Sequence, residues 1–201
     1  FVYMVARQAQ TDNPFVATMT IGLMFLLAAL FGRRQAFSAL GFGWVAAGFF
    51  LFALLNLGPQ FSIIATDLYD PNAVGIANVI QQNGVWHVVL FYAPVSIALL
   101  ISIAVPLWRQ HATGGMGDAA FQDLWLRRFL LYCSYMMFAQ ATYAKGLLGF
   151  CVPGAILVLY LVASGNWRIV GRLDLLRGVP LFLVTALPWY VAMFCRHGMP
   201  Y

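Results

Sequence analysis

Long runs of apolar residues, almost uninterrupted by charge, constrain this chain more than any other feature of its sequence. A helix rises 1.5 Å per residue, so about 20 apolar residues cross the roughly 30 Å of hydrocarbon in a bilayer. Runs close to that length or longer occur at Phe15–Phe31, Phe37–Leu57, Val85–Trp108, Phe129–Ala163 and Val179–Cys195. The pattern predicts an all-α, polytopic transmembrane helical bundle.

The composition excludes the soluble classes of protein. Of the 201 residues, 63% are hydrophobic and 8% are charged, whereas a soluble domain carries about 25% charged residues. A water-soluble fold of this size leaves too much surface exposed to hide that much apolar material. A cytosolic enzyme, a secreted disulfide scaffold and a nucleic-acid-binding protein are therefore excluded. The net charge of +5 is better explained by membrane topology.

The run Phe129–Ala163 is too long for one crossing. As a single helix it would reach roughly 52 Å, well beyond the thickness of the hydrocarbon. Lys145-Gly146 lies near its middle and contains the only charge of the run, so we expect a tight hairpin of two short helices. The count is then about six crossings, preceded by the end of a seventh crossing at Ala6.

The chain begins inside an apolar stretch, which suggests an internal piece of a longer protein. We expect residues 1–201 to be a fragment of a single transmembrane domain. The expected missing parts are the first crossings with their outer loop and any C-terminal soluble domain. The segment alone is therefore expected to be inactive, even if the intact protein is an enzyme.

The distribution of charge supports the predicted count of crossings. With alternating crossings, eight arginines fall on one side and three cations on the other. Because basic residues concentrate on the cytoplasmic side of membrane proteins, the eight arginines mark the cytoplasm. These eight are Arg33, Arg34, Arg109, Arg127, Arg128, Arg168, Arg172 and Arg177. The three outer cations are Arg7, Lys145 and Arg196.

Three segments between the crossings predict short helices in the membrane interface. Asp70-Pro71 is typical of a helix start in the outer loop, with Asp as the N-cap and Pro at the first helical position. Asp118 is expected to cap an amphipathic helix on the inner side. Gly165–Arg177 mixes apolar residues with arginines, which also favours an interfacial segment.

The three outer cations admit two interpretations. Charges at membrane depth are costly and tend to mark substrate or ion paths, and all three lie at the outer ends of expected crossings. One interpretation is a cationic cluster that holds an anionic headgroup, such as the phosphate or pyrophosphate of a lipid-linked substrate. The other is that each long side chain extends separately toward the phosphates of membrane lipids.

Three segments resemble motifs of the GT-C membrane glycosyltransferases. Residues 7–15, RQAQTDNPF, are similar to the element R-x-x-x-T-D-x-P-[FL] at the head of a membrane helix. Residues 143–154, YAKGLLGFCVPG, resemble the hairpin (L/T)-A-K-G-x-x-G-x-x-x-P-G, and residues 187–198, LPWYVAMFCRHG, resemble the helix exit A-L-P-W-Y…R-x-G. The similarity is closest to the dolichyl-phosphate-mannose–protein mannosyltransferases and the aminoarabinose transferases. Residues 37–122 match no motif of this family.

This resemblance implies an enzyme that moves a hexosyl or pentosyl group from a polyprenyl-phosphate donor at the extracytoplasmic face. The acceptor would be a protein, a lipid or a glycan, as in protein glycosylation or lipid A modification. An inverting displacement needs a carboxylate to activate the acceptor and cations to stabilise the departing phosphate. On this model Lys145 and Arg196 bind the leaving phosphate. Arg7 and Asp12 orient each other or contact a substrate, and His197 adds a hydrogen bond or, alternatively, a metal ligand.

Several roles stay open at this point. Asp12 equally suits the N-cap of its helix, and His197 equally suits a solvated position at the interface. The acidic motif of the family precedes this segment, and the chain contains no Glu, so the catalytic residues and any divalent metal cofactor are unassigned. The expected location is a bacterial inner membrane. A transporter or flippase, or a non-catalytic membrane scaffold, is the alternative class of function.

Overall fold

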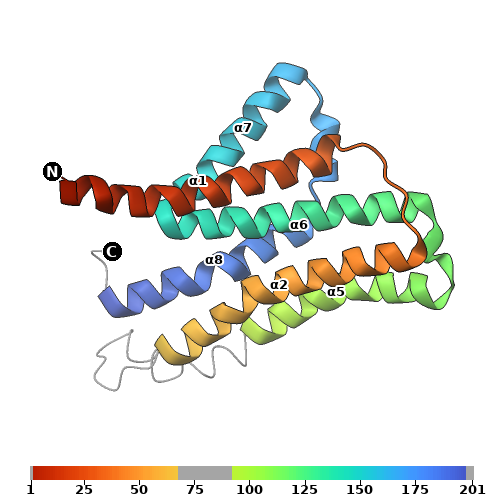
Figure 1. Cartoon of the computed structure of the whole chain (residues 1–201), viewed down its shortest axis with the longest axis horizontal. Helices are drawn as coiled ribbons and strands as arrows, with labels where there is room; N and C mark the ends of the chain where they lie inside the picture. Colours follow the sequence, from red (N-terminus) through yellow and green to blue (C-terminus); the bar gives the residue numbers. More distant parts are fainter. Residues whose placement is uncertain (1, 68–91, 198–201) are drawn as a thin grey trace.

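The computed structural model describes the backbone of residues 2–67 and 92–197 and the side chains of residues 13–61 and 92–191. Within these ranges every regular element is helical, which confirms the all-α prediction there. The α-helices are α1 (Val2–Phe31), α2 (Ala39–Asp67), α5 (Ala93–Ala112), α6 (Ala119–Lys145), α7 (Leu148–Ser164) and α8 (Leu175–His197). Two short 3-10 helices, η2 (Gly115–Gly117) and η3 (Trp167–Arg172), lie between them (Figure 1).

The helices run back and forth between two ends of one bundle (Figure 1). We call one end the arginine end, because the eight arginines named above lie in or beside the connections and helix termini found there. The opposite end is the lysine end, where α6 closes at Lys145 and α7 begins. The start of α1 and the end of α8 also lie at the lysine end. The two groups of cations therefore belong to opposite ends of the bundle.

The central helix of the bundle is α6, which packs against α1, α2, α7 and α8. Phe129 stacks on Phe49 of α2, with 4.6 Å between the ring centroids. Leu131 and Phe138 belong to a second buried cluster that includes Met19 of α1. The two clusters lie on different faces of α6, so this one helix holds the core together.

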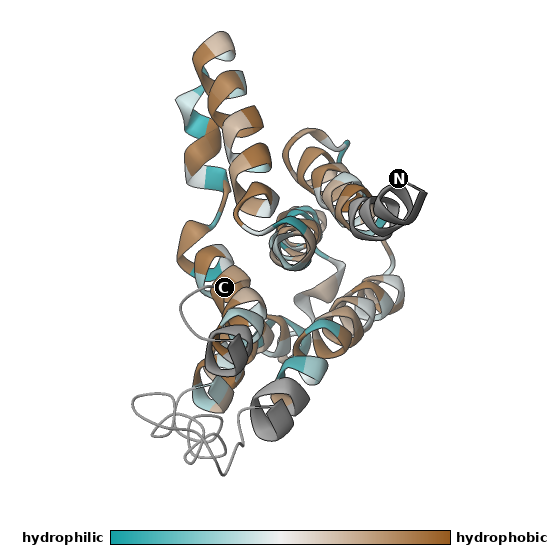
Figure 2. Ribbon diagram, turned by 90° about the vertical axis from the view of Figure 1, so that its left-hand side faces the viewer, coloured by the Kyte–Doolittle hydropathy of each residue, from teal (hydrophilic) through white to brown (hydrophobic). Residues whose placement is uncertain are grey.

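The helices around α6 carry much of the exposed apolar surface (Figure 2). Three described segments are long and apolar enough to cross a membrane: Asn13–Phe31, Ala39–Phe61 and Ala93–Ala112. They belong to α1, α2 and α5, while the central α6 is not among the three. Trp44 and Leu54 of α2 are 72% and 63% exposed. Apolar side chains that face outward around a more polar central helix support a membrane protein.

The hairpin predicted at Lys145-Gly146 is confirmed. α6 ends at Lys145, and α7 begins at Leu148 after a turn. Gly146 forms the C-cap of α6, with its N–H donating to the carbonyl of Thr142 at 2.8 Å. The limit that a bilayer places on helix length therefore located this turn correctly from the sequence.

The first arm of the hairpin is longer than predicted. Asp118 does cap a helix, since its Oδ1 accepts a hydrogen bond from the backbone N–H of Ala120 at 3.0 Å. That helix continues without a break to Lys145, because no proline or glycine interrupts α6. The expected interfacial helix is thus the first part of α6. The other interfacial helix, predicted after Asp70-Pro71, lies outside the described residues.

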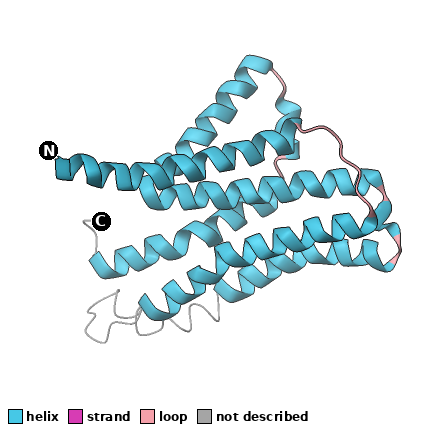
Figure 3. Cartoon of the chain, in the orientation of Figure 1, coloured by secondary structure: helices cyan, strands magenta, loops and turns pink. Residues whose placement is uncertain are grey.

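The first helix does not break where the sequence predicts. We expected a crossing that ends at Ala6 and a new helix from Phe15, but α1 is one unbroken helix (Figure 3). Pro14 lies inside it, and the hydroxyl of Thr18 donates to the Pro14 carbonyl at 2.7 Å. Membrane helices tolerate such prolines. The separate seventh crossing is therefore wrong, and Asp12 lies within α1 rather than at its N-cap.

The interfacial segment predicted at Gly165–Arg177 forms η3 and the first turn of α8. Its amphipathic character is confirmed, because Ile169 and Leu173 are buried while Arg168 and Arg172 are exposed. Asp174 joins the two helices with a φ of 41°, in the left-handed region. α8 then starts at Leu175, several residues before the predicted crossing.

Candidate functional site

The sequence predicts a cationic site, and the backbone brings all its positions to the lysine end. Arg7 and Asp12 lie in the first half of α1, and Arg196 and His197 form the last residues of α8. The side chains of these four residues lie outside the described part. Lys145 is the last residue of α6, and its side chain is half-buried. α1 begins, and α6 and α8 end, at this same end of the bundle (Figure 1).

Two of the three motif segments pack directly against each other. The rings of Tyr143, in the hairpin motif, and Trp189, in the helix-exit motif, lie 5.8 Å apart. The hydroxyl of Tyr143 donates to the carbonyl of Thr185 in α8. In return, the hydroxyl of Tyr190 donates to the carbonyl of Thr142 in α6 at 2.8 Å. The end of α6 is therefore fastened to α8 from both sides.

Two of the three glycines of the hairpin motif, Gly146 and Gly149, have a steric reason. Gly146 adopts φ 60° and ψ −139°, a conformation that residues with a Cβ avoid. A Cβ on Gly149 would lie 2.4 Å from the backbone nitrogen of Thr142 and 2.6 Å from the carbonyl carbon of Ala141. The start of α7 thus crosses the end of α6 at a distance that only glycine allows. This crossing fixes the backbone from which Lys145 projects.

The interior of the bundle near this turn is polar. Gln140 of α6 donates a hydrogen bond to Asn56 of α2. Three buried polar atoms, Gln60 Oε1, Tyr92 OH and Ser96 Oγ, have no hydrogen-bond partner within the described part of the chain. Buried polar groups in a membrane bundle are costly and tend to mark functional paths. Sequence reasoning missed these residues, although single polar residues inside apolar runs were the available signal.

An apolar cavity lies beside the same turn. It has a volume of about 330 Å³ and lies between α6, α7 and α8. Leu147, from the turn itself, lines it together with Phe150 of α7. Thr142 and Tyr190, which form the hydrogen bond between α6 and α8, also line it. The cavity has the chemical character needed for a hydrocarbon chain.

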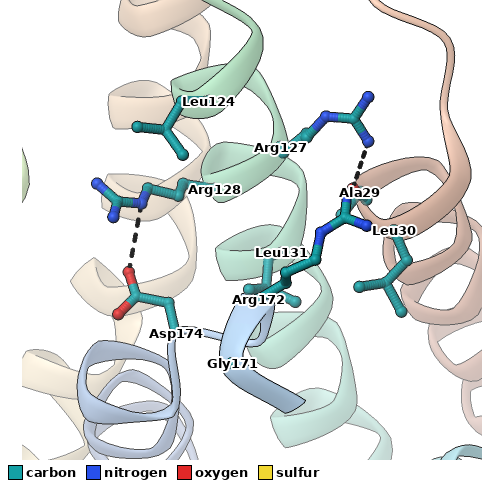
Figure 4. Close-up of a pocket in the computed structure, with 9 residues that line it drawn as sticks. All are labelled: Ala29, Leu30, Leu124, Arg127, Arg128, Leu131, Gly171, Arg172 and Asp174. Carbon is teal, nitrogen blue, oxygen red and sulfur yellow. Dashed lines mark hydrogen bonds and ion pairs between the residues drawn. The ribbon is translucent and has the colours of Figure 1, made fainter. Parts of the chain in front are cut away.

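A second, charged pocket lies at the arginine end and was not expected from the sequence. It has a volume of about 200 Å³ between α1, α6 and the connection from η3 to α8 (Figure 4). Arg127, Arg128, Arg172 and Asp174 line it. The sequence identified these arginines only as markers of the cytoplasmic side, because their convergence depends on segments far apart in the chain.

Arg127 ties this pocket to the end of α1. Its guanidinium donates to the carbonyls of Ala29 and Gly32 at 3.1 and 2.8 Å, and its Nε lies 3.0 Å from Asp123 Oδ2. A cation suits the C-terminal end of a helix, where carbonyls lack intrahelical partners. Arg127 therefore completes the last turn of α1.

Asp174 is shared among three partners on the other side of the pocket. Its Oδ2 accepts hydrogen bonds from the Tyr132 hydroxyl at 2.5 Å and from Arg177 Nη1 at 3.2 Å. The Nε of Arg128 lies 3.7 Å from the same oxygen. Arg128 also lies over the ring of Trp125, 5.0 Å from its centroid. The carboxylate of Asp174 is thus neutralised by the residues around it.

The described residues contain no group of three or more His, Cys, Asp or Glu side chains that could hold a metal ion. The divalent metal expected at the site stays a prediction, because the side chains of Asp12 and His197 lie outside the described part. Comparison with protein-family models, with curated proteins and with solved structures finds no match for this chain. The arrangement of the motif residues at the lysine end is therefore the main indication of function.

Proposed function

We propose that this chain belongs to a membrane glycosyltransferase that uses a polyprenyl-phosphate sugar as its donor. The observation that carries the proposal is the packing of the hairpin motif against the helix-exit motif. Tyr143 packs on Trp189, and Tyr190 binds Thr142, the residue just before the hairpin motif. The two contacting pairs join residues more than 40 positions apart in the sequence, so two segments that resemble one family's motifs form one structural unit beside Lys145. A shared site explains why both would occur in one chain.

The proposed chemistry is stabilisation of a departing lipid phosphate. Lys145 and Arg196 supply positive charge to the phosphate as the bond from its oxygen to the anomeric carbon breaks and the acceptor forms the new glycosidic bond, which lowers the energy of the transition state. Arg7 and Asp12 orient each other or contact donor or acceptor, and His197 contributes a hydrogen bond. The carboxylate that activates the acceptor is not assigned to any residue of this chain.

The apolar cavity beside the turn supports a donor with a hydrocarbon carrier. Its lining by Leu147 and Phe150 suits an isoprenoid chain, and its edge at Tyr190 lies in the motif unit that includes Lys145. A lipid carrier held there would keep its phosphate near the turn. A concave, mostly apolar lining is typical of ligand sites.

The proposed topology treats all six described α-helices as crossings of a multi-pass protein in a bacterial inner membrane. The arginine end then faces the cytoplasm, in agreement with the positive-inside rule. The lysine end, with the proposed site, faces the extracytoplasmic side. α6 crosses as well in this proposal, since the apolar helices around it screen its polar residues from lipid.

A transporter or flippase is the second candidate, and a specific observation favours it. The unpartnered polar atoms of Gln60, Tyr92 and Ser96 lie inside the bundle, where a transport path would need them. These groups carry no charge, however, and ion coupling usually uses ionisable residues. A non-catalytic membrane scaffold is the remaining alternative.

The direct test is sugar transfer by the full-length protein in proteoliposomes, with radiolabelled polyprenyl-phosphate sugar as donor. We expect Lys145→Ala to lower turnover about 100-fold, in line with the loss of one electrostatic stabiliser of a transition state. Lys145→Arg should retain part of the activity because it keeps the charge. Arg168→Ala, at the opposite end, is the matched control and should leave turnover unchanged.

Melting temperatures of all three variants must match that of the wild type for the comparison to hold. Equal turnover in Lys145→Ala and wild type would overturn the role of Lys145. Movement of the labelled lipid across the membrane without any transfer would instead support the flippase.

A further inference from the structure

The charged pocket at the arginine end carries an excess of positive charge. Arg127 and Arg128 are matched by Asp123 and Asp174, and Arg177 adds a further cation beside Asp174. Arg172 is exposed and forms no hydrogen bond or ion pair with any described residue. Four arginines and two aspartates therefore leave a net charge of +2 in and around one pocket.

Three separate elements meet at this pocket, and two of them contribute guanidinium groups. Arg127 comes from α6, Arg172 from η3, and the carbonyl oxygen of Ala29 from the end of α1 (Figure 4). In Figure 4, Arg127 and Arg172 extend toward the end of α1, whereas Arg128 extends toward Asp174. Arg172 and Arg127 therefore present donors on the side of the pocket away from the one carboxylate. Guanidinium groups are suited to bind phosphate through paired hydrogen bonds.

The pocket also lies at the depth of a lipid headgroup. Ala29 and Leu30, which line it, are among the last residues of the membrane-span candidate in α1. Its apolar lining continues through Leu124 and Leu131 of α6. The hydrocarbon ends where such a span ends, so the arginines lie where phosphates of the bilayer are found.

From these observations we propose that the pocket formed by Arg127, Arg128 and Arg172 binds the phosphate of an anionic phospholipid at the arginine end. This site is separate from the donor site proposed at the lysine end and does not depend on it. Asp174 does not oppose such a ligand, because Arg177, Arg128 and the Tyr132 hydroxyl surround its carboxylate. Arg172 is the residue whose charge is available to the lipid.

The test is a titration of the purified full-length protein in detergent with phosphatidylglycerol, followed by native mass spectrometry. We expect Arg172→Gln to weaken the dissociation constant about fivefold, the effect of one cation near a membrane surface. Arg172→Lys should retain most of the affinity. Arg168→Gln is the matched control, because Arg168 is an exposed arginine of the same η3 that does not line the pocket; its effect should stay below twofold.

Two further ligands separate the possible sources of the phosphate. Phosphatidylcholine, whose headgroup has no net charge, should bind at least fivefold more weakly than phosphatidylglycerol. Inorganic phosphate at millimolar concentration should not displace the lipid. The proposal is overturned if Arg172→Gln and Arg168→Gln lose affinity equally, if both lipids bind alike, or if inorganic phosphate competes. Melting temperatures without lipid confirm that each variant is folded.

Discussion

The two ends of the bundle are held together in different ways. At the arginine end, polar side chains reach across the chain: Gln122 binds the backbone of both Phe37 and Met116, and Arg127 binds the end of α1. At the lysine end, close packing joins the helices alongside the two tyrosine hydrogen bonds between α6 and α8, since Gly149 lets α7 approach α6 and Tyr143 packs on Trp189. In lipid the hydrophobic effect does not drive helices together, so tight packing of small residues takes its place.

The two ends are sensitive to different kinds of substitution. An end held by hydrogen bonds fails when a partner is removed, because buried donors and acceptors are left unpaired. An end held by packing fails when an atom is added. Removal of a hydrogen-bonding group should therefore destabilise the arginine end, whereas addition of an atom should destabilise the lysine end.

The largest effect should come from Gln122→Leu at the arginine end. Gln122 is fully buried, and its amide makes three hydrogen bonds of 2.7–3.0 Å to the backbone of Phe37 and Met116. Their loss should lower the free energy of unfolding by about 3 kcal/mol, because each unpaired buried group costs about 1–3 kcal/mol. Unfolding in detergent, followed by circular dichroism, measures the change. Gln35→Leu, at an exposed glutamine, should change stability by less than about 0.5 kcal/mol; equal effects would contradict the prediction.

The next effect should come from adding one methyl group at the lysine end. Gly149→Ala forces a Cβ against the backbone of Thr142, so α7 must move away from α6. We expect a loss of about 2 kcal/mol, typical of overpacking. Gly154→Ala is the matched control on the same helix, since nothing lies within 4 Å of its added Cβ. Gly154→Ala should be neutral or stabilising, as alanine favours helices, and a larger loss there than at Gly149 would refute the steric argument.

A smaller effect should distinguish Asp174 from Asp123, the two acidic residues that pair with arginines at the arginine end. Asp174→Asn removes the charge that Arg177 and Arg128 share, and we expect a loss of about 1–2 kcal/mol, as for hydrogen bonds to charged groups. Asp123→Asn breaks one ion pair between positions i and i+4, which is worth about 0.3–0.5 kcal/mol. Chemical unfolding of both variants in the same detergent tests the order. Equal losses would show that Asp174 is not the centre of this network.

The smallest effect should come from one hydroxyl at the lysine end. Tyr190→Phe removes the 2.8 Å hydrogen bond to the carbonyl of Thr142 and keeps the ring. We expect a loss of about 1 kcal/mol, the usual net value of one hydrogen bond. Tyr160→Phe is the control, because Tyr160 lies exposed on α7. If the two variants have the same melting temperature, packing alone holds α6 against α8, which would increase the contrast between the two ends.

Local signals in the sequence predicted local structure well. The hairpin at Lys145-Gly146 follows from the length limit of a bilayer, and the cap at Asp118 needs only its neighbours. The failure at α1 also has a local cause. Asp12 suggested an N-cap before Phe15, but the helix continues through this polar stretch and through Pro14, whose own carbonyl accepts a hydrogen bond from the hydroxyl of Thr18.

Contacts between distant segments could not be predicted from the sequence. Gln122 binds the backbone of Phe37, 85 residues away, and no feature of either segment predicts this contact. The pocket around Arg172 depends on the same kind of convergence, so its arginines had only the sign of their charge as a signal. Of the candidate site, the sequence located Lys145 at its turn, while Gln60 and the other buried polar groups emerge only when α2, α5 and α6 are assembled.

The hydrogen bonds of Arg127 have a consequence for biosynthesis. The carbonyls of Ala29 and Gly32 are 98 and 95 residues away from the guanidinium that binds them. A ribosome must therefore translate well into α6 before the last turn of α1 can find its partner. Until then, water must solvate those carbonyls, so the nascent α1 keeps a frayed terminus at the membrane surface. A chain that ends before Arg127 would contain all of α1 but lack the side chain that binds the carbonyls at its end.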